Sequence, residues 1–520
     1  MIARTIPALV FGAADRFPEI EALVDGEVRL TFPQLRDEII RAARAFLAAG
    51  ISAGDRVAVW APNTWEWVVG ALGAQFAGAA LVPINTRFKG AEAADVLLRS
   101  DAAALLTVNG FLGTDYVSML RSSGVELPSL RDIVVMCGDP PEGCSGWDAF
   151  LTRGASIRAD SIGALVADAA PEAVSDIIFT SGTTGRPRGV VCTQGQTLRV
   201  FEDWSGIVGL EAGDRYLIVN PFFHTFGYKA GVLACLLRGA TIVPEAVFDV
   251  DRVLAKVAAE RISVLPGPPT LYFSILANEH RADHDLSSLR LAVTGAAAVP
   301  VELLRRMREE LSFRTIITGY GLTESTGTIS MCRPQDAPET ISTTSGRAIH
   351  DVEVRVVDDG GMEVARGATG EIVCRGYNVM QGYLDDPEAT AEAIDADGWL
   401  HTGDIGTMDE RGYLQITDRK KDIFIVGGFN AYPAEIEGMI LRYPGVAQVA
   451  VVGVPGARLG EVGVAYVVPR PGDVVDPDSL LTWCRAEMAN FKVPSAVHVV
   501  DALPLNASGK VLKYELRARA

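Results

Sequence analysis

A loop rich in glycine, serine and threonine is the segment of this sequence best suited to chemistry. It reads FTSGTTGRPRGVV, spans residues 179–191 and continues directly from the apolar run DIIFT. Glycine lets a phosphate approach the backbone closely, and Ser and Thr hydroxyls supply hydrogen-bond donors. The loop does not follow the spacing of a Walker A motif. Taken alone, it is either a flexible turn or a phosphate-binding loop of another kind.

The elements around this loop predict an α/β protein. Apolar runs that end in Gly, Pro or Asn alternate with helical patterns, which predicts mostly parallel sheets covered by helices. Ligands in such folds bind at the carboxyl ends of the strands. Past Gly346 short antiparallel strands are expected, and after DRKKD (418–422) a compact α+β unit begins. The expected strands of the first part lie in 55–62, 103–109, 176–182, 262–267, 289–295 and 314–321.

Composition restricts the partners and the location. The net charge of −18 and the pI near 4.9 argue against nucleic acid and anionic membranes as partners. The seven cysteines show no CxxC spacing, which favours a reducing cytoplasm.

The apolar stretch 67–84 approaches the length of a membrane span, but Gln75 and Pro83 interrupt it. We expect a buried helix that leads into a buried strand, and no stable membrane insertion.

Several further motifs follow the loop in a fixed order. They resemble the adenylate-forming (ANL) acyl-CoA synthetases, the superfamily that also holds firefly luciferase and the adenylation domains of peptide synthetases. The finer likeness is to actinobacterial ligases for polycyclic acids derived from steroids. The resemblance covers essentially the whole chain, and it is carried by FTSGTTGRPRG (179–189), PFFHTFG (221–227), TGYGLTES (318–325), GEIVCRGYNVMQGYLDDPEAT (370–390), GWLHTGDIG (398–406), DRKKDIFIVGGFNAYPAEIE (418–437) and NASGKVLKYELR (506–517).

The resemblance implies both an architecture and an activity. A large N-terminal domain of parallel-type sheets covered by helices, plus a distorted β-barrel, would span 1–420. A small mobile α+β domain would span 421–520, with its hinge at Lys421. The implied enzyme activates a bulky carboxylic acid, polycyclic and derived from a steroid or diterpenoid, with ATP and Mg²⁺. It then transfers the acyl group from the acyl-adenylate to coenzyme A.

The resemblance also implies the site residues. Lys510 would bridge the carboxylate and the α-phosphate, and His224 would gate entry of the thiol. Glu324 and Thr184 would bind Mg²⁺, and Arg188 would contact the outer phosphates. Contacts with the nucleotide or with coenzyme A are implied for Thr180, Ser181, Gly182, Thr183, Gly185, Gly295, Ala296, Gly319, Tyr320, Gly321, Thr323, Asp404, Arg419, Lys421, Gly427, Gly428 and Phe429.

Two positions depart from the pattern and leave alternatives open. Arg188 stands where the family carries lysine, and its longer planar group need not preserve the phosphate geometry. Leu505 stands before ASGK, where basic residues are common. One alternative is therefore a ligase that performs only thioester formation, on acyl-AMP supplied by a separate adenylating enzyme. A non-catalytic acyl-nucleotide binding protein is the alternative of another class, and a homodimer is compatible with either.

The resemblance places the acyl pocket around residues 226–231, 267–273 and 319–326. Small residues there, such as Gly227, Ala230 and Gly231, suggest room for a bulky acid. Apolar neighbours would favour a hydrocarbon body by roughly 25 cal/mol per Å² of buried surface. Lys229 is the one basic residue there for a second carboxylate; otherwise it faces solvent.

Overall fold

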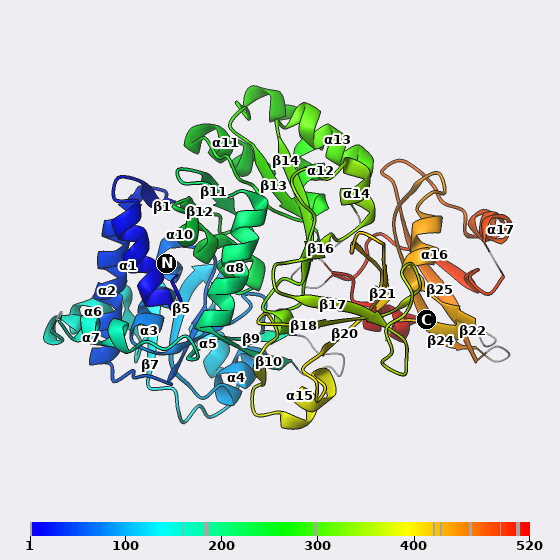
Figure 1. Cartoon of the computed structure of the whole chain (residues 1–520). Coiled ribbons are helices and arrows are strands. Elements are labelled where there is room, and N and C mark those ends of the chain that lie inside the picture. The colour runs from blue at the N-terminus through cyan, green and yellow to red at the C-terminus, as the bar shows by residue number, and fades with distance from the viewer. Residues whose placement is uncertain are drawn as a thin grey trace. The chain divides into compact units, whose positions relative to one another are not determined.

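The computed structural model describes residues 3–158, 160–180, 187–295, 299–419, 422–426, 429–456, 460–488, 490–505 and 510–520. Only the backbone is described for Asp160, Ala164, Arg419, Phe429, Asn430 and Gly460. The chain divides into two compact units, which we call the first unit (Met1–Glu353 with Cys374–Leu400) and the second unit (Val354–Val373 with His401–Ala520). In Figure 1 the first unit runs from blue to yellow along the chain.

The largest sheet belongs to the first unit and carries the glycine-rich loop. Its strand order is β19-β10-β9-β4-β3-β5-β7-β8, with β6 paired to β5. The central strands are parallel, whereas β10 is antiparallel to β9. Parallel strands are buried on both faces, which explains their continuous apolar runs. The strands are β3 (Arg56–Trp60), β4 (Ala80–Pro83), β5 (Ala102–Phe111), β6 (Thr114–Asp115), β7 (Asp132–Cys137), β8 (Ser145–Gly146), β9 (Val174–Thr180), β10 (Arg188–Thr193) and β19 (Gly382–Tyr383).

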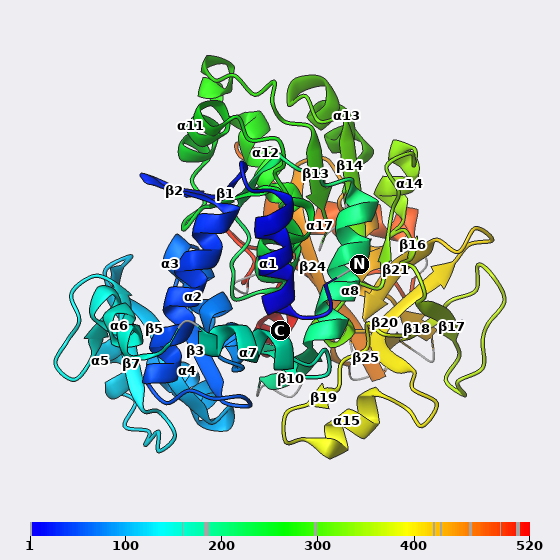
Figure 2. The ribbon, with the colours of Figure 1, turned by 60° about the vertical axis from the view of Figure 1, so that its left-hand side comes forward.

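Three helices, α1 (Ile6–Arg16), α2 (Phe32–Ala48) and α3 (Trp65–Phe76), lie side by side in the first unit (Figure 2). A Cβ on Gly73 would lie 2.6 Å from the Cβ of Ala42, so glycine is what lets α3 approach α2 this closely. Helix α3 is buried from Trp67 onward and precedes the buried strand β4. This confirms the predicted helix and strand in 67–84, and no helix in the described ranges has the length and hydropathy to cross a bilayer.

Two smaller sheets complete the first unit, in the orders β11-β12-β1-β2 and β13-β14-β15-β16. Their parallel strands end at loops that carry predicted site residues: β11 precedes PFFHTFG, and β13 and β14 precede Gly295 and Gly321. The strands are β1 (Glu21–Asp25), β2 (Val28–Thr31), β11 (Arg215–Ile218), β12 (Thr241–Pro244), β13 (Leu291–Thr294), β14 (Thr315–Tyr320), β15 (Ser330–Met331) and β16 (Arg347–Ala348).

The strand expected in 262–267 is reduced to a single bridge residue. Val264 bridges Tyr216 on one side and Leu291 on the other. Pro266 and Pro268 follow, and proline has no backbone N–H to continue a ladder. The other five expected strands are present as β3, β5, β9, β13 and β14.

The second unit contains antiparallel strands and the C-terminal α+β fold. One sheet has the order β17-β18-β20-β21 and the other β23-β22-β25-β24, with β26 paired to β25. The α+β fold buries an apolar core that includes Phe424, Ile436 and Val451. The strands are β17 (Glu353–Val357), β18 (Gly370–Arg375), β20 (Leu400–Met408), β21 (Leu414–Arg419), β22 (Phe424–Val426), β23 (Phe429–Ala431), β24 (Val446–Gly456), β25 (Gly460–Pro469) and β26 (Ala496–Val499).

The remaining helices connect these strands, and several of them, including α5, α8, α11, α15 and α17, begin at a side chain that caps the first turn. Thr193 and Gln196, for example, form a reciprocal capping box at the start of α8. The helices are α4 (Gly90–Arg99), α5 (Tyr116–Arg121), α6 (Trp147–Arg153), α7 (Asp160–Asp168), α8 (Gln194–Val208), α9 (Thr225–Gly227), a π-helix (Tyr228–Leu233), α10 (Ala234–Arg238), α11 (Val250–Glu260), α12 (Pro269–Ala277), α13 (Val301–Glu310), α14 (Pro338–Thr343), α15 (Pro387–Ala393), α16 (Pro433–Ile440), α17 (Pro477–Glu487) and α18 (Lys513–Arg519), with 3₁₀ turns at Gly154–Ser156, Glu279–Asp283 and Thr323–Ser325.

Candidate active site

The glycine-rich loop connects the antiparallel strands β9 and β10. Thr180 ends β9 and pairs in register with Arg188, the first residue of β10. The strand pair therefore fixes both ends of the loop. The predicted contacts at Ser181, Gly182, Thr183, Thr184 and Gly185 lie outside the described residues.

Arg188 and Glu324 are linked through a tyrosine that sequence reasoning did not single out. The Arg188 guanidinium lies 5.2 Å from the centroid of the Tyr383 ring, and its Nε lies 3.8 Å from Asp386 Oδ2. The Tyr383 hydroxyl donates a hydrogen bond to Glu324 Oε1 at 3.0 Å. Burial, and then the Glu324 charge, raise the pKa of Tyr383 well above its ordinary value. The hydroxyl therefore keeps its proton and acts as a donor to the carboxylate.

The turn between β19 and α15 positions Tyr383. The Tyr383 amide donates to Thr390 Oγ1 at 2.9 Å, and that hydroxyl donates to the Asp386 carbonyl at 2.8 Å. Gly382 has φ +147°, and a Cβ there would lie 2.9 Å from Thr390 Cγ2, so the turn requires glycine.

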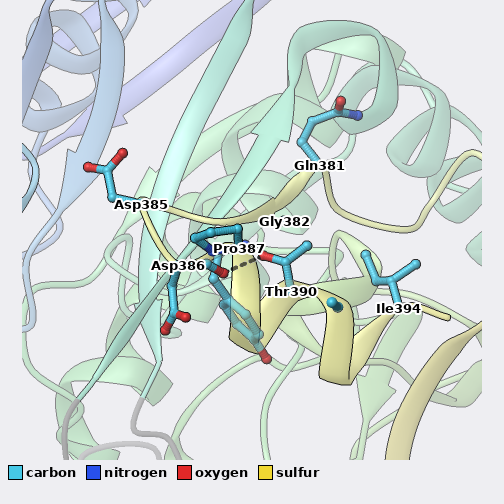
Figure 3. Close-up of a pocket in the computed structure, with 9 residues that line it drawn as sticks. Gln381, Gly382, Asp385, Asp386, Pro387, Thr390 and Ile394 are labelled. Carbon is cyan, nitrogen blue, oxygen red and sulfur yellow. Dashed lines mark hydrogen bonds between the residues drawn. The ribbon is translucent and has the colours of Figure 1, made fainter. Parts of the chain in front are cut away.

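A surface groove also forms at this turn (Figure 3). Tyr383, Pro387 and Ile394 contribute to its lining, together with the acidic residues Asp385 and Asp386. Carboxylates repel the phosphates of a nucleotide, so this groove does not suit the triphosphate.

The turn that carries Glu324 is held by the segment before β19. The Met380 amide donates to the Glu324 carbonyl at 2.9 Å, and Thr326 Oγ1 donates to the Asn378 carbonyl at 2.7 Å. Ser325 Oγ accepts from the Leu322 amide at 2.9 Å and closes the 3₁₀ turn that contains Thr323. Backbone contacts thus fix the position of Glu324.

The ends of β13 and β14 bring the predicted adenine contacts together. These strands are parallel, with Thr294 in register with Thr318, so Gly295 and Gly319 emerge at the same edge. A Cβ on Gly295 would lie 3.2 Å from the Gly319 carbonyl oxygen, and one on Gly321 would lie 2.3 Å from the Gly327 carbonyl oxygen. Both glycines permit close backbone packing, and half-buried Tyr320 lies between Gly319 and Gly321. Ala296 lies outside the described residues.

His224 caps the short helix α9 and packs beside the Glu324 turn. Its Nδ1 accepts a hydrogen bond from the Phe226 amide at 3.2 Å. The next residue, Thr225, is in such close contact with Gly327 that a Cβ on that glycine would lie 2.3 Å from Thr225 Cγ2. The segments that carry His224 and Glu324 are therefore neighbours.

Asn63 holds the loop that leads to His224, and sequence reasoning missed it. Its side-chain amide donates to the carbonyls of Ile218 and Asn220 at 3.1 and 2.9 Å, and its Oδ1 accepts from the Phe222 amide at 2.7 Å. Asn63 is buried. Its place just after β3, at the carboxyl end of a parallel strand, was the available signal.

The predicted acyl segment is packed more tightly than its small residues suggested. A Cβ on Gly227 would lie 2.1 Å from the Pro221 carbonyl oxygen, and one on Gly231 would lie 2.9 Å from Ile218 Cδ1. These glycines are required by close packing, which their sequence could not distinguish from open space. The expectations for Lys229 are wrong, because it neither faces solvent nor is available to a second carboxylate. Its side chain is fully buried in an ion pair with Asp176.

In the second unit, Asp404 and Arg419 lie opposite each other on two adjacent strands. They pair in register between β20 and β21, and Asp404 is buried. Glu371 orders the turn before Asp404, because its Oε1 accepts from the Gly403 amide at 3.1 Å. The Arg419 side chain lies outside the described part of the chain.

Lys510 directly precedes Val511, which pairs with Leu505 in the second unit. Leu505 bridges Val511 in antiparallel fashion, and the Leu512 amide donates to the Pro504 carbonyl at 2.8 Å. Lys510 is exposed, and Leu505 is half exposed beside it. Lys421, Gly427 and Gly428 lie outside the described residues, and the Phe429 backbone begins β23, paired with Val426.

Comparison with known proteins identifies the family. The AMP-binding enzyme family matches residues 10–384, and the AMP-binding enzyme C-terminal domain matches residues 435–510. A Rhodococcus jostii protein named as a 7a-methyl-1,5-dioxo-octahydro-1H-inden-4-yl propanoyl:CoA ligase is 52% identical over 99% of this chain and 98% of its own. A Mycobacterium tuberculosis ligase of the same name is 50% identical, with the same coverage of each chain.

Solved structures agree with this assignment. ATP-bound MatB from Rhodopseudomonas palustris superposes with a TM-score of 0.87 at 27% identity, over 99% of both chains. A Mycobacterium tuberculosis fatty acyl CoA synthetase gives a TM-score of 0.78 at 31% identity, over 99% of this chain and 98% of its own. The predicted fold class is thereby confirmed. The chain belongs to the AMP-binding enzyme family, the adenylate-forming acid–CoA ligases.

Proposed function

We propose that this protein is an AMP-forming CoA ligase for a propanoic acid attached to a fused, oxidised bicyclic ring, the remnant of a polycyclic skeleton. The observation that carries the proposal is the 52% identity, over nearly the whole chain, to a ligase named for a methyl-dioxo-octahydroindenyl propanoyl group. The segments around the π-helix and α12 are rich in buried apolar residues, a composition that suits a hydrocarbon body.

The adenylation step is assigned to residues at the strand ends. A carboxylate oxygen of the acid attacks the α-phosphorus of ATP, and the bond to pyrophosphate breaks. Lys510 bridges the carboxylate and the α-phosphate. We assign the phosphates to the loop from Thr180 to Gly185 and to Arg188. The adenine lies against the backbone of Gly295, Ala296 and 319–321, with Thr323 nearby, and the ribose binds Asp404 and Arg419.

Magnesium is part of this proposal. The donor set fits, because the Glu324 carboxylate and the Thr184 hydroxyl are hard oxygen ligands of the kind Mg²⁺ prefers. When bound, the ion would neutralise charge on the phosphates. The hydrogen bond from Tyr383 orients the Glu324 carboxylate independently of any ion.

Thioester formation is assigned to a second set of residues. The sulfur of coenzyme A attacks the acyl carbon, and the bond to the AMP oxygen breaks. His224 controls access of the thiol, and Gly427, Gly428 and Phe429 line the pantetheine channel, where glycine leaves room for a thin arm. The proposed C-terminal domain, residues 421–520, rotates about Lys421 between the two steps.

The free cysteines support a cytoplasmic location for this chemistry.

Arg188 is compatible with both steps. The guanidinium keeps the positive charge of the usual lysine, and its contacts with Tyr383 and Asp386 hold it at the start of β10. We therefore propose a complete ligase. A protein limited to thioester formation would still bind acyl-AMP but would release no pyrophosphate from ATP.

One assay distinguishes the complete ligase from an enzyme limited to thioester formation. Purified protein is incubated with ATP, Mg²⁺, coenzyme A and the dioxo-octahydroindenyl propanoic acid, and both pyrophosphate and CoA thioester are measured. Straight-chain and aryl acids of similar mass serve as controls. We expect both products with the bicyclic acid, at a kcat/KM well above that for the controls.

Two results would contradict the proposal. Thioester formed from synthetic acyl-AMP, without pyrophosphate release from ATP and acid, would indicate the half-reaction enzyme. A preference for straight-chain acids would exclude the bicyclic substrate.

A further inference from the structure

A lysine and an aspartate form an ion pair in the interior of the first unit. Lys229 Nζ lies 2.8 Å from Asp176 Oδ1, and neither side chain is exposed to solvent. Burial lowers the pKa of Lys229, but attraction to Asp176 outweighs it, so the pKa is raised and the lysine is charged. Removing two charges from water is costly, and a packed apolar pair is often as stable. A role beyond stability is therefore worth seeking.

The pair joins two elements that carry proposed site residues. Asp176 lies on β9, the strand that ends at Thr180 before the phosphate loop. Lys229 is the second residue of the π-helix that follows α9, and His224 caps α9. The ion pair thus connects the strand of the phosphate loop to the segment of His224.

A second tie runs parallel to the first. The Tyr228 hydroxyl donates to Gln75 Oε1 at 2.7 Å, and Gln75 Nε2 donates to the Ser175 carbonyl at 2.9 Å. Two consecutive residues of the π-helix are therefore tied to two consecutive residues of β9. Tyr228, Gln75 and Ser175 are all buried in the core.

The π-helical geometry explains why such ties are needed. A π-helix places one extra residue in a turn, is rare, and occurs mostly as single turns at functional sites. Relaxation to an α-helix would change the rotation of the preceding residues, including His224. The charged Lys229 side chain faces Asp176 and Cys192 in the core, and the shift would separate the two charges where no water can replace the contact.

We propose that the Lys229–Asp176 ion pair, together with the Tyr228–Gln75 hydrogen bond, locks the π-helical register of residues 228–233 and thereby positions His224 for thioester formation. Lys229 and Asp176 are positioning residues in this account. The expected effect on thioester formation rests on the proposed role of His224, whereas the expected effect on the π-helix does not.

The test uses a double variant of the full-length protein, Lys229→Met with Asp176→Asn, which removes both charges with little change in volume. Adenylation is measured by pyrophosphate exchange, and thioester formation is measured from synthetic acyl-AMP and coenzyme A. Because a displacement of about 1 Å can cost up to ~100-fold in rate, we expect thioester formation to fall about tenfold or more. Adenylation should fall much less.

A matched control removes another ion pair that has a buried carboxylate. Lys256 Nζ lies 2.6 Å from Glu245 Oε2, and the fully buried Glu245 side chain also pairs with Arg252, whose exposed side chain stays hydrated when the carboxylate is removed. Lys256→Met with Glu245→Gln should leave the ratio of the two half-reaction rates unchanged, because general destabilisation lowers both rates together.

A crystal structure of the Lys229→Met/Asp176→Asn protein supplies a readout that is independent of the reaction. An α-helical turn over residues 228–233 supports the proposal even if the wild-type protein forms no thioester. An intact π-helix together with an unchanged ratio overturns it.

If that double variant does not fold, Tyr228→Phe decides the question. It removes only the second tie, and loss of one hydrogen bond predicts a decrease of about threefold in the ratio. A ratio equal to that of the wild type would then overturn the proposal.

Discussion

Charged side chains in the first unit occur in two very different environments. Arg188 is 27% exposed and contacts the Tyr383 ring and, through a long ion pair, Asp386, whereas Lys229 and Asp176 are 0% exposed and contact each other directly. A partly hydrated charge can change its partners when a ligand arrives. A buried pair cannot, since separating the charges leaves both without water. The first environment suits binding and the second suits positioning.

The single substitution Lys229→Met should produce the largest effect, because it leaves the Asp176 charge buried without its partner. We expect a loss of about 3–5 kcal/mol in the free energy of unfolding. Denaturant unfolding measures this loss. Adding Asp176→Asn should recover most of it, and equal stabilities of the single and double variants would contradict a charged pair.

Glu324→Gln should abolish most adenylation while leaving stability unchanged. In the proposed site Glu324 would hold the ion that neutralises charge on the reacting phosphates, and loss of one such electrostatic contact costs about 10²–10³ in rate. Pyrophosphate exchange measures this effect, and thermal unfolding provides the control. A large decrease in melting temperature would instead place Glu324 with the buried pair as a structural charge.

Tyr383→Phe should reduce adenylation by about tenfold, because a hydrogen bond to a charged group contributes roughly 1.5–3 kcal/mol and this one is only partly buried. Nucleotide affinity measured by calorimetry, with and without Mg²⁺, adds a readout other than turnover. Unchanged rates in both assays would show that backbone contacts alone position Glu324.

Arg188→Lys should have the smallest effect, about threefold in pyrophosphate exchange. A partly exposed contact between a cation and a ring contributes only about 0.5–1 kcal/mol, and lysine restores the charge. The same substitution in the Tyr383→Phe background forms a double-mutant cycle. Additive effects in that cycle would argue against coupling between Arg188 and Tyr383.

Much of the framework could be predicted from local patterns. The apolar runs of β9, β13 and β14 and the glycines that follow them identify the strand ends, because burial on both faces of a parallel sheet imposes that pattern. The register of Asp404 with Arg419 could not be read from sequence, although both lie in recognised motifs.

The long-range pairs could not be predicted, for a physical reason. Tyr383 and Glu324 are 59 positions apart, and only the folded backbone brings them together. Lys229 was misjudged because lysine is almost never fully buried unless it is paired, and its partner lies on a distant strand. A π-helix also has no distinct apolar period, so the turn that carries Lys229 was not visible in the sequence.

The contact between Gly327 and Thr225 constrains any redesign of this enzyme. Gly327 has φ +106°, and even one added carbon would collide with the threonine methyl. A change of volume at Gly327 or Thr225 would therefore displace the segments that carry His224 and Glu324 together. Substitutions meant to alter the range of acids accepted should therefore leave Gly327 and Thr225 unchanged.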